Sequence, residues 1–208
     1  MTKERIKEAL QSKDYVMEHI YIGLQRSSEE EIEKRQSEFE GIEEYLYVRI
    51  CEDGNSFYTA KMTKGLLRLV GIDLELAWDK ALYNTEEDTV IESMESVLGA
   101  LIGIETDSCD MLDTNMYVVS NKSRIKGASG ILNKKDLRRL ADERGIDSFV
   151  MLPSSVHETI LVPACEDMDM ELFNTMVRQV NEAEVAPNER LADRAYIIDV
   201  RLELKCVV

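Results

Sequence analysis

The fold is decided by one stretch of the sequence, Phe149-Val150-Met151-Leu152-Pro153-Ser154-Ser155-Val156-His157-Glu158-Thr159-Ile160-Leu161-Val162-Pro163. Two apolar runs, 149–152 and 159–163, flank a polar connection, which is typical of two strands joined by a turn. We expect the runs to pair as antiparallel strands, with the imidazole of His157 at or near the bend. An acidic start then leads into an amphipathic helix over about 169–182, so the stretch predicts a strand–turn–strand–helix unit. The expected inner face of that helix consists of Leu172, Phe173, Met176, Val177 and Val180.

The same order of elements recurs twice upstream. The first copy has strands at 45–50 and 56–60 around an Asp-Gly turn, and a helix follows. The second copy has strands at 116–119 and 127–132, and a helix capped by Asn133 follows. Three degenerate ββα-like units, each an antiparallel hairpin with a helix, predict an α+β fold.

The N-terminal part of the chain has a different pattern. Residues 1–42 are expected to form a helical segment ahead of an α+β domain over 43–208, or to be part of one domain with it. Apolar residues at mostly helical spacing predict helix over 3–24. Serines followed by glutamates predict a short polar helix over 28–38, because a helix start favours both residue types.

Three further elements complete the expected order. Helical spacing of apolar residues predicts a helix over about 88–102, and the acidic residues after it predict a connecting loop over 105–114. The chain closes with an expected strand over 195–200. That strand could run on through Leu202 and Leu204.

Composition restricts the class of protein. The 208 residues are 44% hydrophobic, which is enough to bury a core. Lys and Arg number 25 against 41 Asp and Glu, so the formal net charge is −16. Such a surface repels polyphosphates and anionic lipids, which disfavours nucleic acid and membranes as partners. The longest run of apolar and glycine residues, 97–104, is too short to span a bilayer.

One basic region stands out in this acidic chain. Residues 116–148 contain eight basic and four acidic side chains. Lys134, Lys135, Arg138 and Arg139 gather in the first turns of the expected helix, where they are a candidate binding patch for an acidic partner or an anion. The alternative is a solvated helix face that neutralises acidic neighbours.

The cysteines and the start of the chain suggest a cytoplasmic protein without cofactors. Cys51, Cys109, Cys165 and Cys206 lie far apart, whereas zinc sites need closely spaced ligand pairs. Residues 1–7 lead into no apolar segment typical of a secretory signal. Neither a phosphate-binding loop nor a dinucleotide glycine pattern is visible, so we expect neither a metal nor a nucleotide cofactor.

The candidate catalytic residues are Ser154, Ser155, His157 and Glu158. A small hydrolase would use either serine as nucleophile, His157 as base and an acid to orient the ring. The connection has no G-x-S-x-G elbow and no glycine-rich oxyanion loop beside it. The alternative is a structural turn whose serine hydroxyls satisfy backbone amides.

The quoted stretch also resembles an uncharacterised bacterial family, known mainly from gut Clostridia among the Firmicutes and catalogued as a domain of unknown function. The resemblance extends over roughly residues 40–198. Family members carry an additional N-terminal portion that this chain is expected to lack, and Ala192 replaces a usual serine. The resemblance implies the fold and a cytosolic location, but no activity, substrate or cofactor. It is carried by residues 151–163, which include PSSVHE at 153–158, by 180–187, which include NEAEVAP at 181–187, and by 116–122, 127–129 and 92–98.

Three functional hypotheses follow. The first is a non-enzymatic interaction or regulatory module with a protein partner, because core patterning is strong and no complete catalytic constellation is present. The second is the Ser/His hydrolase at residues 153–158. The third is an acidic decoy or immunity-type protein, which would need its carboxylates gathered on one face.

Overall fold

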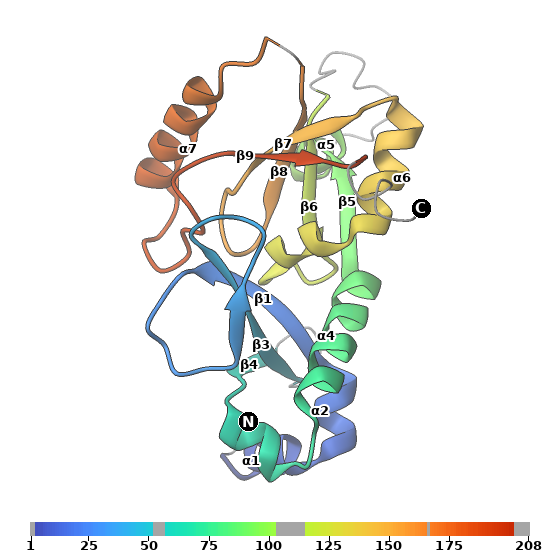
Figure 1. Ribbon diagram of the computed structural model, residues 1–208, viewed down its shortest axis with the longest axis vertical. Helices are drawn as coiled ribbons and strands as arrows, with labels where there is room; N and C mark the ends of the chain where they lie inside the picture. The colour runs from blue at the N-terminus through green and yellow to red at the C-terminus, as the bar shows by residue number, and fades with distance from the viewer. Residues whose placement is uncertain (1–2, 52–56, 103–114, 166, 202–208) are drawn as a thin grey trace. The chain divides into compact units, whose positions relative to one another are not determined.

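The computed structural model describes residues 3–51, 57–102, 115–165 and 167–201. The chain divides into two compact units, Met1–Asp88 and Thr89–Val208 (Figure 1). Each unit contains one antiparallel sheet with helices, so the predicted α+β class is confirmed. The expected boundary between residues 42 and 43 falls inside a strand of the first sheet.

The first unit begins with helices and then changes to a strand earlier than expected. Helices α1 (Lys3–Gln11) and α2 (Lys13–His19) confirm the first part of the expected helix, whereas β1 (Ile20–Arg26) replaces its end. The physical reason is a period of two in 20–25. Apolar Ile20, Ile22 and Leu24 are buried on one face, and more polar residues alternate with them.

The four strands of the first sheet are all joined through β3 (Ile42–Cys51). It pairs antiparallel with β1, β2 (Lys34–Gln36) and β4 (Phe57–Lys61), which confirms the expected β3–β4 hairpin. The Asp-Gly turn of that hairpin lies outside the described residues. The expected polar helix over 28–38 is wrong, because β2 bonds to β3 and Glu33 accepts a hydrogen bond from the N–H of Leu46.

Two helices complete the first unit. Thr63 caps α3 (Lys64–Leu69), accepting a hydrogen bond from the N–H of Leu66. Helix α4 (Leu74–Asp88) buries Ala77, Trp78, Ala81 and Thr85. The Thr85 hydroxyl accepts the N–H of Ile22 in β1, so the helix is fixed to the sheet by a buried hydrogen bond.

The second unit has a five-stranded antiparallel sheet of order β5-β6-β8-β7-β9. The expected hairpin over 149–163 is confirmed: Val150 lies opposite Val162, and Leu152 lies opposite Ile160. The expected final strand is confirmed over 196–199, whereas Leu202, Leu204 and the 105–114 loop lie outside the described residues. The elements are β5 (Thr89–Ser93), α5 (Met94–Ile102), β6 (Tyr117–Asn121), η2 (Gly127–Leu132), α6 (Lys134–Arg144), β7 (Ser148–Leu152), β8 (Thr159–Pro163), α7 (Met170–Glu184) and β9 (Tyr196–Asp199).

Two expectations in this unit are wrong. The expected helix over 88–102 begins only at Met94, because 89–93 pairs with β6 as β5. The expected strand over 127–132 is the 3-10 helix η2. Strand β6 is already paired on both sides, with β5 and β8, so no ladder position is left for a returning strand.

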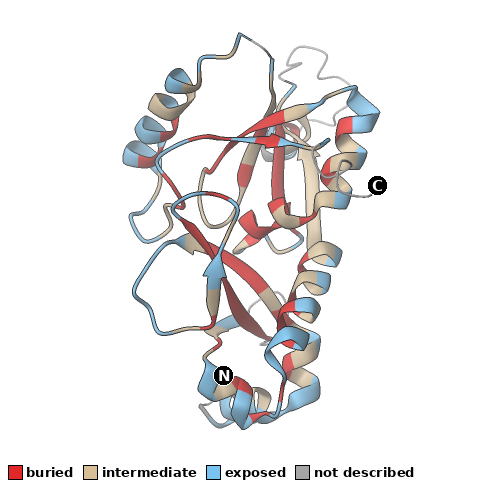
Figure 2. Cartoon of the chain, in the orientation of Figure 1, coloured by how far each residue is buried: buried red, intermediate tan, exposed pale blue. Residues whose placement is uncertain are grey.

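The two faces of this sheet carry different helices (Figure 1). On one face η2 packs closely, because a Cβ added at Gly130 would lie 3.0 Å from the side chain of Val119. On the other face α7 buries Val177 against Val150, Leu152 and Ala195. Figure 2 shows β6 and β7 as largely buried, β5 as intermediate, and α7 as a mostly exposed or intermediate helix.

Candidate functional site

Three segments that are distant in the sequence meet at the imidazole of His157. Its Nδ1 atom accepts the backbone N–H of Lys126 at 3.2 Å, and its Nε2 atom lies 3.4 Å from the carboxylate of Glu189. Because Nδ1 is an acceptor, the proton of the neutral ring is on Nε2, the atom that faces the carboxylate of Glu189. The ring therefore joins the loop after β6, the β7–β8 connection and the segment after α7.

The backbone N–H and carbonyl of His157 are also hydrogen-bonded. Its carbonyl accepts the hydroxyl of Ser120 at 2.8 Å, and its N–H donates to the hydroxyl of Ser155 at 3.1 Å. The adjacent Val156 donates to the carbonyl of Glu189 at 2.8 Å. The β7–β8 connection is therefore held by hydrogen bonds from two other segments.

The serines of this connection do not reach the imidazole. The Ser155 hydroxyl accepts the His157 N–H, and the N–H of Ser154 bonds to the carbonyl of Leu152. Within the described part of the chain, no hydrogen bond joins either hydroxyl, or the Glu158 carboxylate, to the ring. The lone pair of Nδ1 accepts the N–H of Lys126, and Nε2 carries the proton of the neutral ring, so the imidazole has no free lone pair with which to accept a serine proton in this arrangement.

The loop after β6, which donates the Lys126 N–H to His157, has an unfavourable backbone conformation at two residues. Arg124 and Lys126 have φ angles of 57° and 55°, in the left-handed region that non-glycine residues rarely adopt. The side chain of Asn121 fixes the turn between them: it accepts the N–H of Ile125 at 3.2 Å and donates to the carbonyl of Ile125 at 2.8 Å. The Asn121 amide and the His157 ring thus hold successive N–H groups, those of residues 125 and 126.

The roles of Asn121, Lys126 and Glu189 were missed by the sequence analysis. An Asn at a strand end ahead of a polar turn is a signal for an Asx-type turn, which could have identified Asn121. Glu189 carried no such signal. Its contact with His157 depends on the path of the chain after α7, which brings residue 189 beside the β7–β8 connection.

The predicted basic patch lies on the first turns of α6. Asn133 caps the helix as expected, accepting the N–H of Asp136 at 3.1 Å. Lys135 and Arg139 are exposed, whereas Lys134 and Arg138 are half-buried. Helix α6 therefore presents a row of cations, which we call the α6 basic row. Its members are Lys134, Lys135, Arg138 and Arg139.

Acidic side chains limit this row. The Arg139 guanidinium bonds to Asp136 at 3.1 Å, and Asp142 and Glu143 are exposed one turn further along. Arg124, in the neighbouring loop, forms an ion pair with Glu92. The α6 basic row is therefore confined to the N-terminal half of the helix.

Helix α7 exposes a row of large apolar side chains that the sequence analysis placed inside. Leu172, Met176 and Val180 are 57%, 44% and 48% exposed, whereas Val177 is buried and Phe173 is half-buried. We call Leu172, Met176 and Val180 the α7 flank. The correction concerns three of the five expected inner residues.

The reason lies in how α7 is fixed. The Asn181 side chain donates to the carbonyl of Ala192 at 2.7 Å, and the Asn174 side chain accepts the N–H of Ala195 at 2.9 Å. These two residues, seven positions apart, turn one side of the helix toward the chain that leads into β9. The apolar residues of α7 cover a wider part of the helix circumference than the part that contacts the sheet. The apolar residues farthest from the sheet therefore remain exposed.

The first sheet carries a polar cluster that is buried and internally paired. Burial opposes the charge of Arg49, but Tyr47 and Asp88 outweigh this effect and raise the pKa of Arg49. The guanidinium bonds to Asp88 at 2.5 Å and lies 3.9 Å from the centre of the Tyr21 ring. Burial raises the pKa of Tyr47, so its hydroxyl stays protonated. The side chains of this cluster bind one another, because Arg49 contacts Tyr47, Asp88 and Tyr21. Such mutual pairing is typical of a structural network.

The sequence contains a signal for this polar face: polar or aromatic side chains recur at every second residue of β3, and such residues lie on one face of a strand. They are Glu43, Tyr45, Tyr47 and Arg49. Its acidic end is also paired. Burial raises the pKa of Glu43, but hydrogen bonds from Gln25, Ser28 and Lys34 outweigh it and the net shift is downward.

Helices on antiparallel sheets, in two compact units, define the chain as an α+β protein. Among the described residues, no group of His, Cys, Asp or Glu could hold a metal ion, and no helix is long and apolar enough to cross a bilayer. The chain belongs to the family of unknown function DUF5688, whose model matches residues 8–199. Comparisons with curated proteins and with solved structures found no match.

Proposed function

We propose that this protein is a non-catalytic interaction module of the cytoplasm, and that the α7 flank is its principal contact surface for a partner protein. The observation that carries the proposal is the exposure of Leu172, Met176 and Val180 in one row. Large apolar side chains gathered on one helix face are a recurrent feature of protein-binding surfaces.

The α6 basic row supports a second, electrostatic contact with an acidic part of a partner. It lies on the helix that accompanies η2, away from the sheet face covered by α7. Rim charges of this kind chiefly raise association rates and select partners. The net charge of −16 supports a protein partner over nucleic acid or an anionic membrane.

The geometry gives the two alternative functions less support. A Ser/His hydrolase needs a ring nitrogen free to accept the serine proton, whereas Nδ1 of His157 already accepts the N–H of Lys126 and Nε2 faces the carboxylate of Glu189. An acidic decoy needs carboxylates gathered on one face and unpaired with cations. In the first unit Glu43 is bound by Lys34, and Glu44 by Arg35.

A differential capture experiment tests the proposal. Tagged wild type, a flank variant (Leu172→Ser, Met176→Ser, Val180→Ser) and a control variant are incubated with lysate of the source cells. The control replaces equally exposed apolar residues of the first unit: Leu69→Ser, Leu76→Ser and Tyr83→Ser, whose wild-type side chains are 67%, 47% and 55% exposed.

Quantitative mass spectrometry should find at least one protein enriched by the wild type and the control variant but lost with the flank variant. Circular dichroism of all three proteins checks that they are folded. Identical captured sets from the three proteins would contradict the proposal.

A further inference from the structure

We infer that the α7 flank receives an amphipathic helix of the partner whose apolar face carries basic residues at both ends. This inference rests on the proposed function and specifies the chemistry of the partner. It is argued from the spacing of the apolar residues and from the charges around them.

The apolar part of the surface has the dimensions of a helix contact. Leu172, Met176 and Val180 follow one another at intervals of four residues, so the row is about 12 Å long, the length of slightly more than two helical turns. Anchors at such intervals are typical of helix–helix recognition.

The row continues into a half-buried apolar shelf. Phe173 on α7, with Ile160 and Val162 on β8, are only partly buried against the core under the helix. Asn174 and Asn181 hold the opposite side of α7 to the 192–195 segment, so this shelf borders the flank. A partner helix could therefore bury side chains between the flank and β8.

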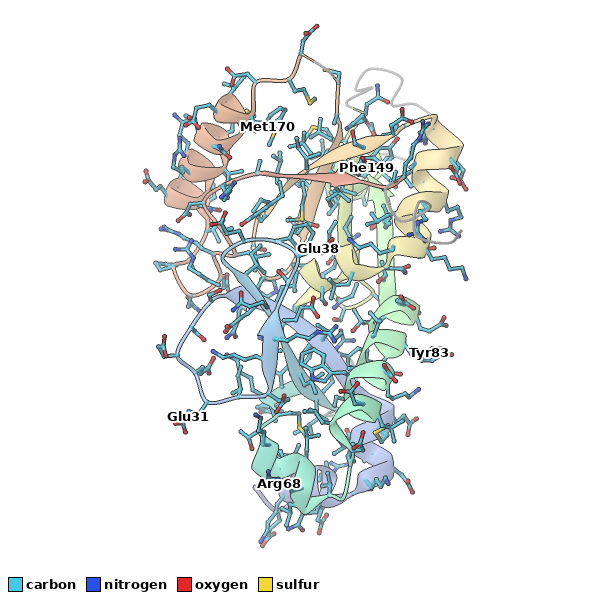
Figure 3. All side chains as sticks on the ribbon, in the orientation of Figure 1. Glu31, Glu38, Arg68, Tyr83, Phe149 and Met170 are labelled. Atoms are coloured by element: carbon cyan, nitrogen blue, oxygen red, sulfur yellow. The ribbon has the colours of Figure 1, made fainter. Side chains whose placement is uncertain are left out.

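Acidic side chains bracket the row. Asp167, Asp169 and Glu171 precede or begin the helix, and all three are exposed (Figure 3 labels the helix start, Met170). Glu182 and Glu184 are exposed at its C-terminal end, where the helix dipole adds partial negative charge.

The only cation of the described residues between 167 and 184, Arg178, neutralises one of these acids, Glu171, and bonds to none of the other four. Arg178 bonds to the carboxylate of Glu171 at 2.8 Å and to the hydroxyl of Thr175 at 3.0 Å. An apolar row with acids at both ends is complementary to an apolar face with Lys or Arg at both ends.

The same charges disfavour two other occupants. In a second copy of this chain, packed flank to flank, acidic ends would approach acidic ends. An anionic membrane surface would be repelled for the same reason. Both remain measurable outcomes of the test.

The test uses the whole chain and a synthetic probe peptide of about 14 residues, long enough for nearly four helical turns. The probe carries Leu at helical spacing on one face and Lys elsewhere. One control peptide has the same composition in an order that breaks the apolar face, and another replaces every Lys with Glu. Titration calorimetry is performed in about 0.15 M salt, where long-range attraction is screened.

We expect the Leu/Lys peptide to bind and both control peptides to bind at least about tenfold more weakly. The flank variant should lose at least about tenfold in affinity, and the control variant of the first unit should bind like the wild type. Asp167→Asn with Asp169→Asn should weaken binding and reduce its dependence on salt.

Equal binding of the Leu/Lys peptide to the wild type and the flank variant would overturn the inference, because charge alone would explain it. Equal binding of the Leu/Glu peptide would also overturn it. Self-association of the wild type that the flank variant abolishes, seen by light scattering, or flank-dependent binding to phosphatidylcholine–phosphatidylglycerol vesicles, would replace the inferred occupant.

The inference and the proposed function can fail separately. If a lysate protein depends on the flank but the Leu/Lys peptide does not bind, the inferred chemistry is wrong and the interaction module stands. If no lysate protein depends on the flank, the proposed function itself is contradicted.

Discussion

The Nδ1 atom of His157 accepts the backbone N–H of Lys126, a residue with a left-handed φ of 55°. The ring thereby satisfies a backbone group that no strand or helix pairs, in a loop that is costly to form. On its other side Nε2 reaches Glu189. The histidine that the sequence offered as a catalytic base is thus positioned as a structural link between loops.

Replacing His157 should therefore lower stability. His157→Ala removes the acceptor of the Lys126 N–H, a half-buried backbone donor, so we expect the free energy of unfolding to fall by about 1–3 kcal/mol. Urea denaturation followed by circular dichroism measures the change. Glu158→Ala is the matched control and should change stability by less than about 0.5 kcal/mol. Equal effects of the two substitutions would contradict the structural role of the ring.

Two glycines should respond to alanine with opposite signs. Gly145 ends α6 with a φ of 66°, so Gly145→Ala should destabilise by about 1 kcal/mol, although nothing lies within 4 Å of the added Cβ. Gly65 lies inside α3 and an added Cβ would meet only an ordinary contact at 3.7 Å, so Gly65→Ala should stabilise by about 0.5–1 kcal/mol. Thermal unfolding of both variants checks the signs. Destabilisation by Gly65→Ala would contradict the α3 geometry.

Acid should weaken the first unit through Glu43. Its pKa is lowered in the folded protein, where burial is outweighed by bonds from Gln25, Ser28 and Lys34. The unfolded state therefore binds the proton more tightly, and the stabilisation is present above the unfolded pKa of about 4.3 and is lost as pH falls through the folded pKa. Denaturation at a series of pH values from neutral to about pH 3 should show a shallower fall below about pH 4.5 for Glu43→Gln than for the wild type. Parallel curves would contradict this assignment.

Much of the fold could be predicted because local patterns and tertiary packing agree. The 149–163 hairpin has two short apolar runs around a polar turn, and its two strands occupy inner positions of the sheet. Thr63 and Asn133 were recognisable caps, since their side chains satisfy the first N–H groups of α3 and α6. Such signals are contained within a few residues of sequence.

The errors arose where tertiary context decides. Residues 127–132 follow a strand and a polar turn and were therefore expected to return as a strand, but both edges of β6 are already occupied. Residues 20–26 follow a helix without a break, and their period of two was read as helical spacing. The exposure of Met176 depends on two Asn side chains of α7 that bond to the chain beyond it, which periodicity does not report.

The candidate site was predicted in part. The sequence identified His157 and the turn around it, and the structure brings Ser155 and His157 together through a backbone hydrogen bond. Glu189 joins the ring from a position 32 residues away, so only the return of the chain after α7 could reveal it.

The α6 basic row should contribute to partner capture through charge. Lys135→Glu with Arg139→Glu reverses two exposed cations, so capture of a partner with an acidic contact should fall severalfold and lose part of its salt dependence. Lys7→Glu with Lys13→Glu, two exposed cations of the N-terminal helices, is the matched control. A comparable loss in both variants would show that only net charge matters.

The most direct test of the central claim is photocrosslinking in the source cells. A benzophenone amino acid replaces Met176 in one protein and Tyr83 in another, because both side chains are exposed, at 44% and 55%. Contact through the α7 flank predicts a discrete crosslinked partner from position 176 and none from position 83. No adduct at position 176, or the same adducts at both positions, would contradict the claim that this protein binds its partner through α7.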